Sequence, residues 1–499
     1  MTRPTRFTHS LLKSPKHLSY GLALIAIACV FFADLDISAS QASRELLRMG
    51  KGLIAPNFWS FSAIANSAFT TLAFALQGMA LAVIAGFALA LLYRFSVVRA
   101  FCAFIRAIHE LFWALIFIQL FGLSPLAGLL AIALPYAGIL AKIYGELFEE
   151  TDAAPRNNLL HSSGLSAFFY TTLPLAWRPL RQYTRYRFEC AIRSSIVLGF
   201  IGLPTLGYHL ETALGNGQYN DAAALLYVLL AIVVSLRWWL KKALLPIYLI
   251  SAFIYLPPAA HISWANITRF FSEDIIPAPL RHPSNTDLSG LSDWLALLWH
   301  QQIASGLGST LILSQIALLL TAILSLAWFP LNSQQFFSPL KRNIGDGFLI
   351  LARTLPEYLL AFIGLLLLGP SMLPAILALG VHNGAIIAHL LGRFSGDLVL
   401  RDDACQGRNR YFYEVLPRVY RHFLALLLYR WEVIMRETAI LGILGIGTLG
   451  FYIDSAFEEF RFDRAMLLIL CAALLNMSAD GLAHWLRKRL HLNTTAETL

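Results

Sequence analysis

The stretch YRFECAIRSSIVLGFIGLPTLG, residues 186–207, decides how this chain is organised. It returns as YRWEVIMRETAILGILGIGTLG at residues 429–450, always at an offset of 243 residues. A segment of 22 residues that recurs at such a distance predicts two copies of one structural unit. The matching positions are Tyr186/Tyr429, Arg187/Arg430, Glu189/Glu432, Arg193/Arg436, Leu198/Leu441, Gly199/Gly442, Gly202/Gly445, Thr205/Thr448 and Gly207/Gly450, with Gly164/Gly407 and Pro174/Pro417 upstream.

The composition places these two units in a membrane. Of 499 residues, 58% are apolar and 13% charged, and the mean hydropathy is +0.63. Soluble domains carry about 25% charged residues. Residues 72–92 form one apolar run in which Gln77 is the single strongly polar side chain, long enough to cross a bilayer. The runs have the length of helices rather than of alternating barrel strands, so we expect an all-α membrane protein.

Charge and cysteine content exclude several other classes. The net charge of +9 fits the accumulation of Lys and Arg on the cytoplasmic side of membrane proteins and does not require nucleic acid. The five cysteines show no spacing typical of a metal site. The apolar stretch at 20–32 lacks a small-residue cleavage pattern, which favours a retained first helix.

The order of apolar runs and basic segments predicts about 12 transmembrane helices, six in residues 1–240 and six in residues 241–499. An even number per half makes the repeats parallel, related by an axis along the membrane normal. The positive-inside rule puts both termini and both large basic loops in the cytoplasm. Within the first half we expect helix 3 over about 108–122, helix 4 over about 126–144 and helix 5 over about 190–207.

Each large basic loop contains a possible elbow between two short helices. The first reads EETDAAPRNNLLHSSG and then LSAFFYTTLP, and the second reads GDLVLRDDACQG and then RNRYFYEVLP. A glycine permits a tight exit from a short helix, and a proline is tolerated at a helix start. Two such elbows would suit a partner with two equivalent binding sites. The alternative interpretation is that each elbow is an ordinary connecting loop.

Two sets of paired residues in helix 5 are candidates for a gate. Glu189/Arg193 and Glu432/Arg436 are i,i+4 pairs in the favourable order. They form either an ion-pair ring at the inner gate or structural pairs that hold the elbow to helix 5. The glycines at equivalent places in both copies either line a pore or let helices pack closely; they are Gly199, Gly202, Gly442 and Gly445.

Other chemistry finds less support in the sequence. His109, Glu110 and Glu357 lie near the start of helix 3 in their halves, and His382 and His389 are seven residues apart on helix 4 of the second half, too far for one ordinary metal site. We therefore expect no metal and no cofactor. The sequence lacks GxxxxGK[ST], which indicates that the chain does not hydrolyse ATP itself.

The repeated segment resembles the permease subunits of bacterial ATP-binding-cassette (ABC) importers of the phosphonate/phosphite type. The resemblance rests on YRFE-x3-R-x4-LG-x2-G-x4-G, on YRWE followed by the same spacing, and on EETDAAP ahead of the first elbow. Family members usually carry one six-helix unit and dimerise, whereas here two units look fused. The second elbow loop is four residues shorter, since Gly145/Gly392 are 247 apart and Pro174/Pro417 are 243 apart.

The resemblance implies a permease in the bacterial inner membrane that works with two cytoplasmic ABC ATPases and an extracytoplasmic substrate-binding protein. The elbows would be the coupling helices that dock on the ATPases, and the substrate a small phosphorus oxyanion such as phosphonate or phosphite. The residues implied are Asp152, Asn157, Asn158, Gly164 and Pro174 in the first elbow, and Asp402, Asp403, Cys405, Gly407 and Pro417 in the second.

Three alternatives remain open from the sequence. One is a fused permease for thiamine or ferric iron. Another is a secondary transporter built from parallel repeats, against which the near absence of mid-span charges argues. The third is a non-transporting scaffold or a membrane enzyme.

Overall fold

The structure is a computed structural model of the chain. It describes residues 15–38, 42–152, 154–157, 164–260, 262–281, 288–401, 406–490 and 492, and every regular element among them is helical. Helices of the first half are α2 (Pro15–Val30), α3 (Ala42–Ile54), α4 (Phe61–Leu91), α5 (Ser96–Ala107), α6 (Glu110–Phe121), α7 (Pro125–Glu150), α8 (Ala154–Asn157), α9 (Gly164–Ala167), α10 (Leu173–Val197), α11 (Leu206–Gly215) and α12 (Tyr219–Trp239).

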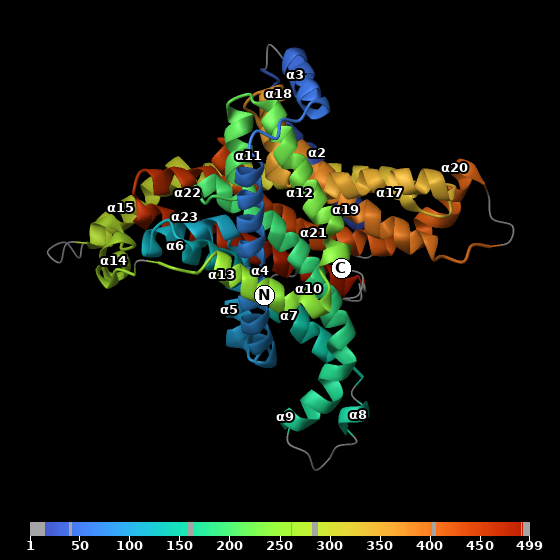
Figure 1. Cartoon of the computed structure of the whole chain (residues 1–499), viewed down its shortest axis with the longest axis horizontal. Helices are drawn as coiled ribbons and strands as arrows, with labels where there is room; N and C mark the ends of the chain where they lie inside the picture. Colours follow the sequence, from blue (N-terminus) through green and yellow to red (C-terminus); the bar gives the residue numbers. More distant parts are fainter. Residues whose placement is uncertain are drawn as a thin grey trace, which may run out of the picture. The chain divides into compact units, whose positions relative to one another are not determined.

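The second half continues this series (Figure 1). Its helices are α13 (Leu245–Tyr255), α14 (Trp264–Arg269), α15 (Leu288–Leu298), α16 (Ala304–Trp328), α17 (Pro339–Thr354), α18 (Glu357–Leu368), α19 (Met372–Gly396), α20 (Gly407–Asn409), α21 (Leu416–Leu441), α22 (Leu449–Glu458) and α23 (Phe462–Arg489). Short π and 3-10 turns, labelled η, join several of them.

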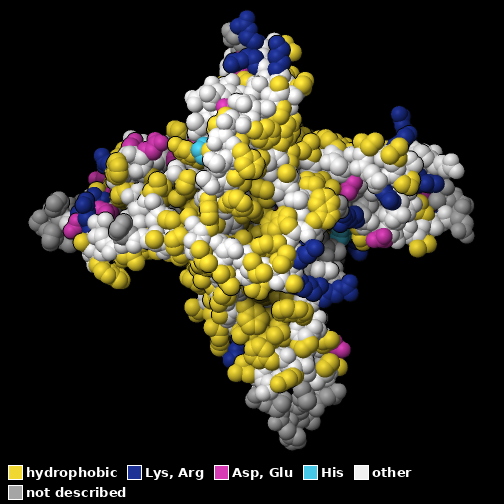
Figure 2. Space-filling model, in the orientation of Figure 1, with side chains coloured by type: hydrophobic (Ala, Val, Ile, Leu, Met, Phe, Trp, Pro, Cys, Tyr) yellow, Lys and Arg dark blue, Asp and Glu magenta, His cyan; other side chains and the backbone are white. Residues whose placement is uncertain are grey.

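The apolar elements confirm the all-α membrane fold. Among the described residues, six helices are long and apolar enough to cross a membrane, four further pairs of bent helices pass the same test together, and α2 and the segment containing α13 are shorter apolar helices. The test thus supports up to ten spans, and the expected twelve are reached when the two shorter helices are counted as well. Large apolar side chains of the spans are exposed, such as Phe69 and Ile84 on α4, and Figure 2 shows hydrophobic side chains over much of the visible surface. Lipid would cover these side chains.

The duplication extends to backbone geometry. Helices α5 and α6 meet at 91°, and their counterparts α17 and α18 meet at 87°. The helical run that contains α10 bends by 55° before α11, and the run that contains α21 bends by 45° before α22. Ser124 and Ser371, which are 247 apart, each cap the N-terminus of the helix that follows. Equivalent residues therefore produce equivalent bends.

A further helix precedes the predicted helix 3. The expected span over about 108–122 corresponds to α6, and residues 96–107, for which the sequence analysis predicts no helix, form α5. Cys102 and Ile105 are buried there. They pack on α7 at Gly138, where an added Cβ would lie 2.7 Å from the Ile105 side chain. This buried apolar face stabilises α5. The arginines of α5 lower its mean hydropathy, so a hydropathy profile does not show the helix.

The compact units of the structure do not follow the sequence repeats. One unit combines α2 with the helices from α15 onward, and the other spans Leu47–Asp274. In the first of these, α2 packs on α16, and Tyr420 Oη donates to Ser19 Oγ at 2.6 Å. In the second, α13 packs on α4. The first helix of each half thus packs with the other half, and the division at residue 240 remains a proposal about the sequence repeat.

The buried Gln77 explains part of this arrangement. Its Nε2 donates to the carbonyl oxygens of Ala252 and Leu256 at 2.8 and 2.6 Å. Carbonyl groups in the last turn of a helix have no partner within it, and in a membrane an unsatisfied one is costly. The single polar side chain in the apolar run at 72–92 therefore fixes α13 to α4.

Candidate functional site

The repeated glycine motif breaks helix 5 in both halves. α10 ends at Val197 and α21 at Leu441, and each is followed by a 3-10 turn and a left-handed glycine, Gly202 (φ +91°) or Gly445 (φ +82°). An added Cβ on Gly199 would lie 2.1 Å from the Tyr208 nitrogen. In the second half, an added Cβ on Gly442 would lie 2.0 Å from the Phe451 nitrogen. Only glycine readily adopts a positive φ, and only glycine has no Cβ to clash with the crossing backbone. The repeated glycines therefore specify a break between two closely crossing helices.

The helix after the break is held by a threonine of helix 2. The N–H of Leu206, the first residue of α11, donates to Thr71 Oγ1 at 2.9 Å. In the second half, the N–H of Leu449 donates to Thr310 Oγ1 at 3.1 Å. Each hydroxyl satisfies one of the free N–H groups at a helix start. The two repeats thus fix the break in the same way.

The predicted bounds of helix 5 are wrong at both ends. The helix begins at Leu173 instead of about Cys190 and breaks before Gly207. Buried side chains recur every three or four residues along its first half, at Ala176, Leu180, Tyr183 and Arg187. This is the spacing of one helix face, and the arginines on the other face hide it from an apolar-run search.

The candidate gate residues therefore lie within helix 5 and not at its start. Glu189 and Arg193 are half-buried on α10, and Arg193 Nη2 lies 3.4 Å from Cys190 Sγ. Glu432 and Arg436 are half-buried at the equivalent places on α21. A role in gating remains a prediction for both pairs.

The two elbows differ at their glycines. In the first, Asp152 Oδ1 accepts the N–H of Ala154 at 2.9 Å and so caps α8, which ends at Asn157. Gly164 begins α9 without a positive φ. In the second, Gly407 begins α20 with φ +62°. The other predicted elbow residues lie outside the described residues, namely Asn158, Asp402, Asp403 and Cys405.

Both elbows continue into helix 5 without a break. Pro174 and Pro417 stand at the start of α10 and α21, but the chain is already helical before them, in the π turns η1 (Phe168–Thr172) and η8 (Arg410–Val415). A proline cannot make the usual hydrogen bond to the preceding turn, and a wide π turn accommodates this loss. Residues 164–201 and 407–444 are therefore continuous helical runs.

A buried polar cluster lies on α6, α7 and α10 in the first half. Ser194 Oγ donates to Glu110 Oε1 at 2.6 Å, and Tyr136 Oη lies 3.0 Å from the same Ser194 Oγ. Tyr136 and Ser194 are buried. We call Glu110, Tyr136 and Ser194 the first cluster.

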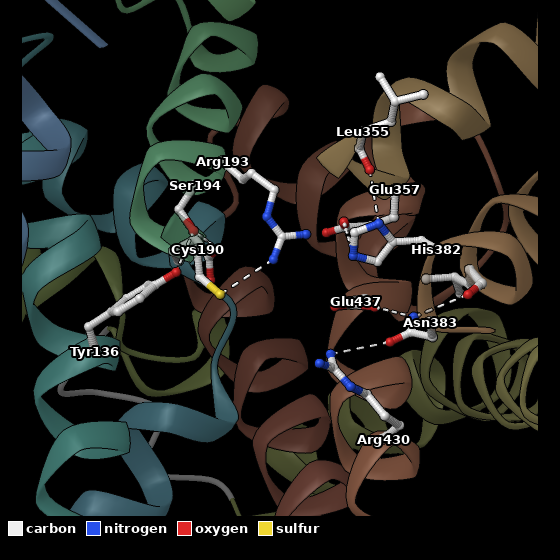
Figure 3. Close-up of polar contacts among 12 residues, drawn as sticks. Tyr136, Cys190, Arg193, Ser194, Leu355, Glu357, His382, Asn383, Arg430 and Glu437 are labelled. Carbon is white, nitrogen blue, oxygen red and sulfur yellow. Dashed lines mark hydrogen bonds and ion pairs between the residues drawn. The ribbon is translucent and has the colours of Figure 1, made fainter. Parts of the chain in front are cut away.

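The equivalent positions form a second cluster in the other half (Figure 3). At the offsets of 247 and 243, its members are Glu357, Asn383 and Glu437. Asn383 Nδ2 donates to Glu437 Oε2 at 2.9 Å, and Arg430 Nη1 donates to Asn383 Oδ1 at 3.4 Å. His382, beside Asn383 on α19, places Nε2 3.6 Å from Glu357 Oε2. The second cluster thus holds two carboxylates where the first holds one.

These clusters are the polar groups that the sequence prediction undervalued. Arg187, Arg430 and Glu437 are each at least 90% buried in helix 5, while the expectation that mid-span charges are nearly absent stays a prediction. Hydroxyl, amide, guanidinium and carboxylate groups together can exchange hydrogen bonds with a polar solute. The described residues contain no group of three His, Cys, Asp or Glu side chains that could hold a metal ion. A comparison of the repeats at positions that differ, such as Ser194 and Glu437, is the signal that would have found the clusters.

Comparison with known proteins reveals relatives that match either most of the chain or less than half of it. Residues 331–492 match the family model of the binding-protein-dependent transport system inner membrane component. A phosphate-import permease of Mycolicibacterium smegmatis is 26% identical over 495 residues, which are 90% of each chain. No solved structure matches.

Shorter relatives match a single unit. A phosphite transport system permease of Stutzerimonas stutzeri is 26% identical over 222 residues, 42% of this chain and 81% of its own. An Escherichia coli protein that bears the name of a cryptic phosphonate transport system permease is 30% identical over 118 residues, 23% of this chain and 96% of its own. One such protein therefore corresponds to less than half of this chain.

Proposed function

The chain belongs to the inner-membrane components of binding-protein-dependent transport systems, and from this premise we propose that it is the fused, two-unit permease of an ATP-driven importer for a small phosphorus oxyanion. The observation that carries the proposal is the match to a phosphate-import permease over 90% of both chains. The named solutes of the relatives are phosphate, phosphite and phosphonate. All three are compact oxyanions of phosphorus.

Energy for import would come from two ATPase subunits on the elbows, because the sequence has no nucleotide-binding motif of its own. An extracytoplasmic binding protein would deliver the solute. The continuous helical runs support this coupling. Ser194 follows Gly164 by 30 residues in one run, and Glu437 follows Gly407 by 30 residues in the other. At 1.5 Å per residue, each elbow is joined to its polar cluster by a helical rod of roughly 45 Å.

The mechanism would be a shift between inward-open and outward-open states. ATP binding that draws the ATPases together would move the elbows, and rigid helices would carry this movement to the breaks at Gly202 and Gly445. Because ATP acts only through its different affinity for the two states, no direct contact between nucleotide and solute is needed.

The test is uptake by a bacterial strain that lacks its own phosphite and phosphonate importers. The strain would express the chain with its native ATPase and binding protein, and uptake of labelled phosphite, phosphate and methylphosphonate would be measured. We expect saturable uptake of at least one of them. Uptake that survives an inactive ATPase would overturn the ATP-driven part of the proposal, and absence of uptake of all three would overturn the substrate class.

A further inference from the structure

A groove of about 430 Å³ lies between α4 and α12, within the unit that spans Leu47–Asp274. Leu72 of α4 forms one wall. The other wall is one face of α12, and its residues are Val228, Ala231, Ile232, Ser235 and Trp239. None of these residues belongs to either cluster. The volume is within the range of sites for small molecules.

The lining offers a ligand no free hydrogen-bond donor. Ser235 Oγ donates to the carbonyl oxygen of Ile232 at 3.2 Å, and Trp239 Nε1 donates to the same oxygen at 3.3 Å. The other lining side chains are aliphatic. A polar solute would lose hydrogen bonds to water here without replacing them, which is costly, whereas a hydrocarbon chain has none to lose. The groove therefore favours a hydrocarbon chain.

The groove has the length of one membrane leaflet. From Val228 to Trp239, α12 rises by roughly 16 Å at 1.5 Å per residue. Half of a hydrocarbon core about 30 Å thick is about 15 Å. The same helices carry exposed apolar side chains, such as Val234 on α12 and Ile84 on α4, so the groove lies on helices that lipid would cover. A lipid acyl chain therefore matches the groove in chemistry and in length.

One end of the groove lies at Trp239, where three helices meet. The Trp239 ring packs on Phe188 of α10 and on Tyr248 of α13, with centroid distances of 6.3 and 5.8 Å. Tyr248 Oη donates to the carbonyl oxygen of Trp239 at 2.9 Å. Tryptophan and tyrosine are enriched where the hydrocarbon core meets the lipid headgroups. This end of the groove is therefore expected at the membrane interface.

Two cations follow directly after this end. Lys241 and Lys242 are exposed, and among the residues that the structure describes their side chains make no salt bridge or hydrogen bond. Arg185 on α10 is also exposed and precedes Phe188 by three residues, which puts the two side chains on one helix face. The positive-inside rule assigns this end to the cytoplasmic leaflet. Basic side chains at this level attract the phosphate groups of anionic lipids.

The equivalent positions of the second repeat differ in both respects. At the offset of 243, Ala231 corresponds to Leu474, and Lys241 and Lys242 correspond to His484 and Trp485. A leucine side chain fills space that an alanine leaves open, and neither of the other two positions has a lysine or an arginine. The small side chain and the two cations thus occur together in one repeat, as one common ligand would require.

We propose that this groove binds one anionic glycerophospholipid of the cytoplasmic leaflet. An acyl chain would lie along α12 between Val228 and Trp239, and the lipid phosphate would contact Lys241 and Lys242. Bound lipid would stabilise the junction of α10, α12 and α13 around Trp239. The site does not depend on which solute the chain transports.

The experiment is titration of the purified full chain, in a neutral detergent, with phosphatidylglycerol and with phosphatidylcholine of the same acyl chains. Native mass spectrometry measures the affinity for the first bound lipid. We expect phosphatidylglycerol to bind about fivefold to twentyfold more tightly, because each lysine near an anionic lipid surface contributes roughly fivefold. Lys241→Gln combined with Lys242→Gln should abolish this preference and leave phosphatidylcholine binding unchanged. The matched control is Lys488→Gln combined with Arg489→Gln, which removes the same charge at the end of α23 and should keep the preference.

A second variant tests the acyl chain. Ala231→Leu introduces the residue of the second repeat and should weaken both lipids by about tenfold, because each methylene group that leaves the groove costs roughly fourfold in affinity. Val234→Leu is the control, since Val234 is exposed on the same helix but does not line the groove. This control should bind both lipids like the wild type.

Equal affinity of the wild type for the two lipids would overturn the headgroup assignment, as would a preference that survives the double lysine variant. Unchanged binding by Ala231→Leu would overturn the acyl-chain assignment. Ala231, Lys241 and Lys242 are exposed, so their variants should fold, and thermal unfolding without lipid checks this. A wild type that imports phosphorus oxyanions but binds both lipids alike contradicts only the lipid site.

Discussion

Asn383 Nδ2 donates to Glu437 Oε2 at 2.9 Å, whereas the equivalent residues of the first repeat are Tyr136 and Ser194, whose hydroxyl oxygens lie 3.0 Å apart. The helices around these two pairs are the same in both halves, and only the side chains have diverged. A fused chain permits this divergence, because each half evolves its own residues. A dimer of identical units would carry the same cluster twice.

Glu437→Ser places the first-repeat residue in the second cluster. The buried Asn383 amide would lose the carboxyl oxygen that accepts its hydrogen bond, and an ordinary hydrogen bond contributes about 0.5–1.5 kcal/mol. We expect the free energy of unfolding to fall by about that amount, and Glu437→Gln, which keeps an acceptor, to lose less. Thermal unfolding of the purified chain in one detergent measures both. A serine variant as stable as the wild type would show that the carboxylate does not stabilise this cluster.

Gly442→Ala should be among the most damaging single-methyl changes in the chain. The new Cβ would lie 2.0 Å from the Phe451 nitrogen, so backbone would have to move, and overpacking of this kind costs about 1–3 kcal/mol or more. The readout is the yield of monodisperse protein on size-exclusion chromatography. Gly447→Ala is the control, because its Cβ would meet nothing within 4 Å and the first repeat has Pro204 there. Equal yields from the two variants would contradict the close-crossing account.

Thr71→Val removes the acceptor for the first N–H of α11 and keeps the shape of the side chain. Loss of a side-chain cap costs about 1 kcal/mol. We expect a lower unfolding temperature and faster hydrogen exchange at Leu206. Thr70→Val, at a buried neighbour for which the described structure has no such bond, is the matched control. If both variants unfold alike, the Thr71 hydroxyl does not hold the helix after the break.

The two elbow glycines should respond differently to proline. Gly407 has φ +62°, which proline cannot adopt, whereas Gly164 begins α9, where proline is tolerated. We expect Gly407→Pro to reduce co-purification of the ATPase strongly and Gly164→Pro to have a weaker effect. Pull-down of the tagged chain with its native ATPase measures the difference. A stronger loss for Gly164→Pro would contradict the conformational argument.

Sequence alone predicted the duplication, the all-α membrane fold and the number of apolar elements, because repeated motifs and hydropathy are local properties. It predicted no helix for α5 and placed the first half of α10 in a loop, because arginines on one helix face mask the buried stripe on the other. It missed the packing of α2 and α13 with the opposite halves, since contacts between distant segments leave no periodic signal. Tyr136 and Ser194 escaped notice for a related reason, as neither residue type is unusual in a membrane helix.

The most direct test of the central claim is reconstitution of the chain in liposomes with its ATPase and its binding protein. The account predicts that labelled phosphite or phosphonate accumulates on the ATPase side only when ATP and the binding protein are present, and that Gly407→Pro reduces this accumulation strongly. Accumulation driven by an ion gradient without ATP would contradict the account and would make the buried charges of helix 5 coupling residues of a secondary transporter.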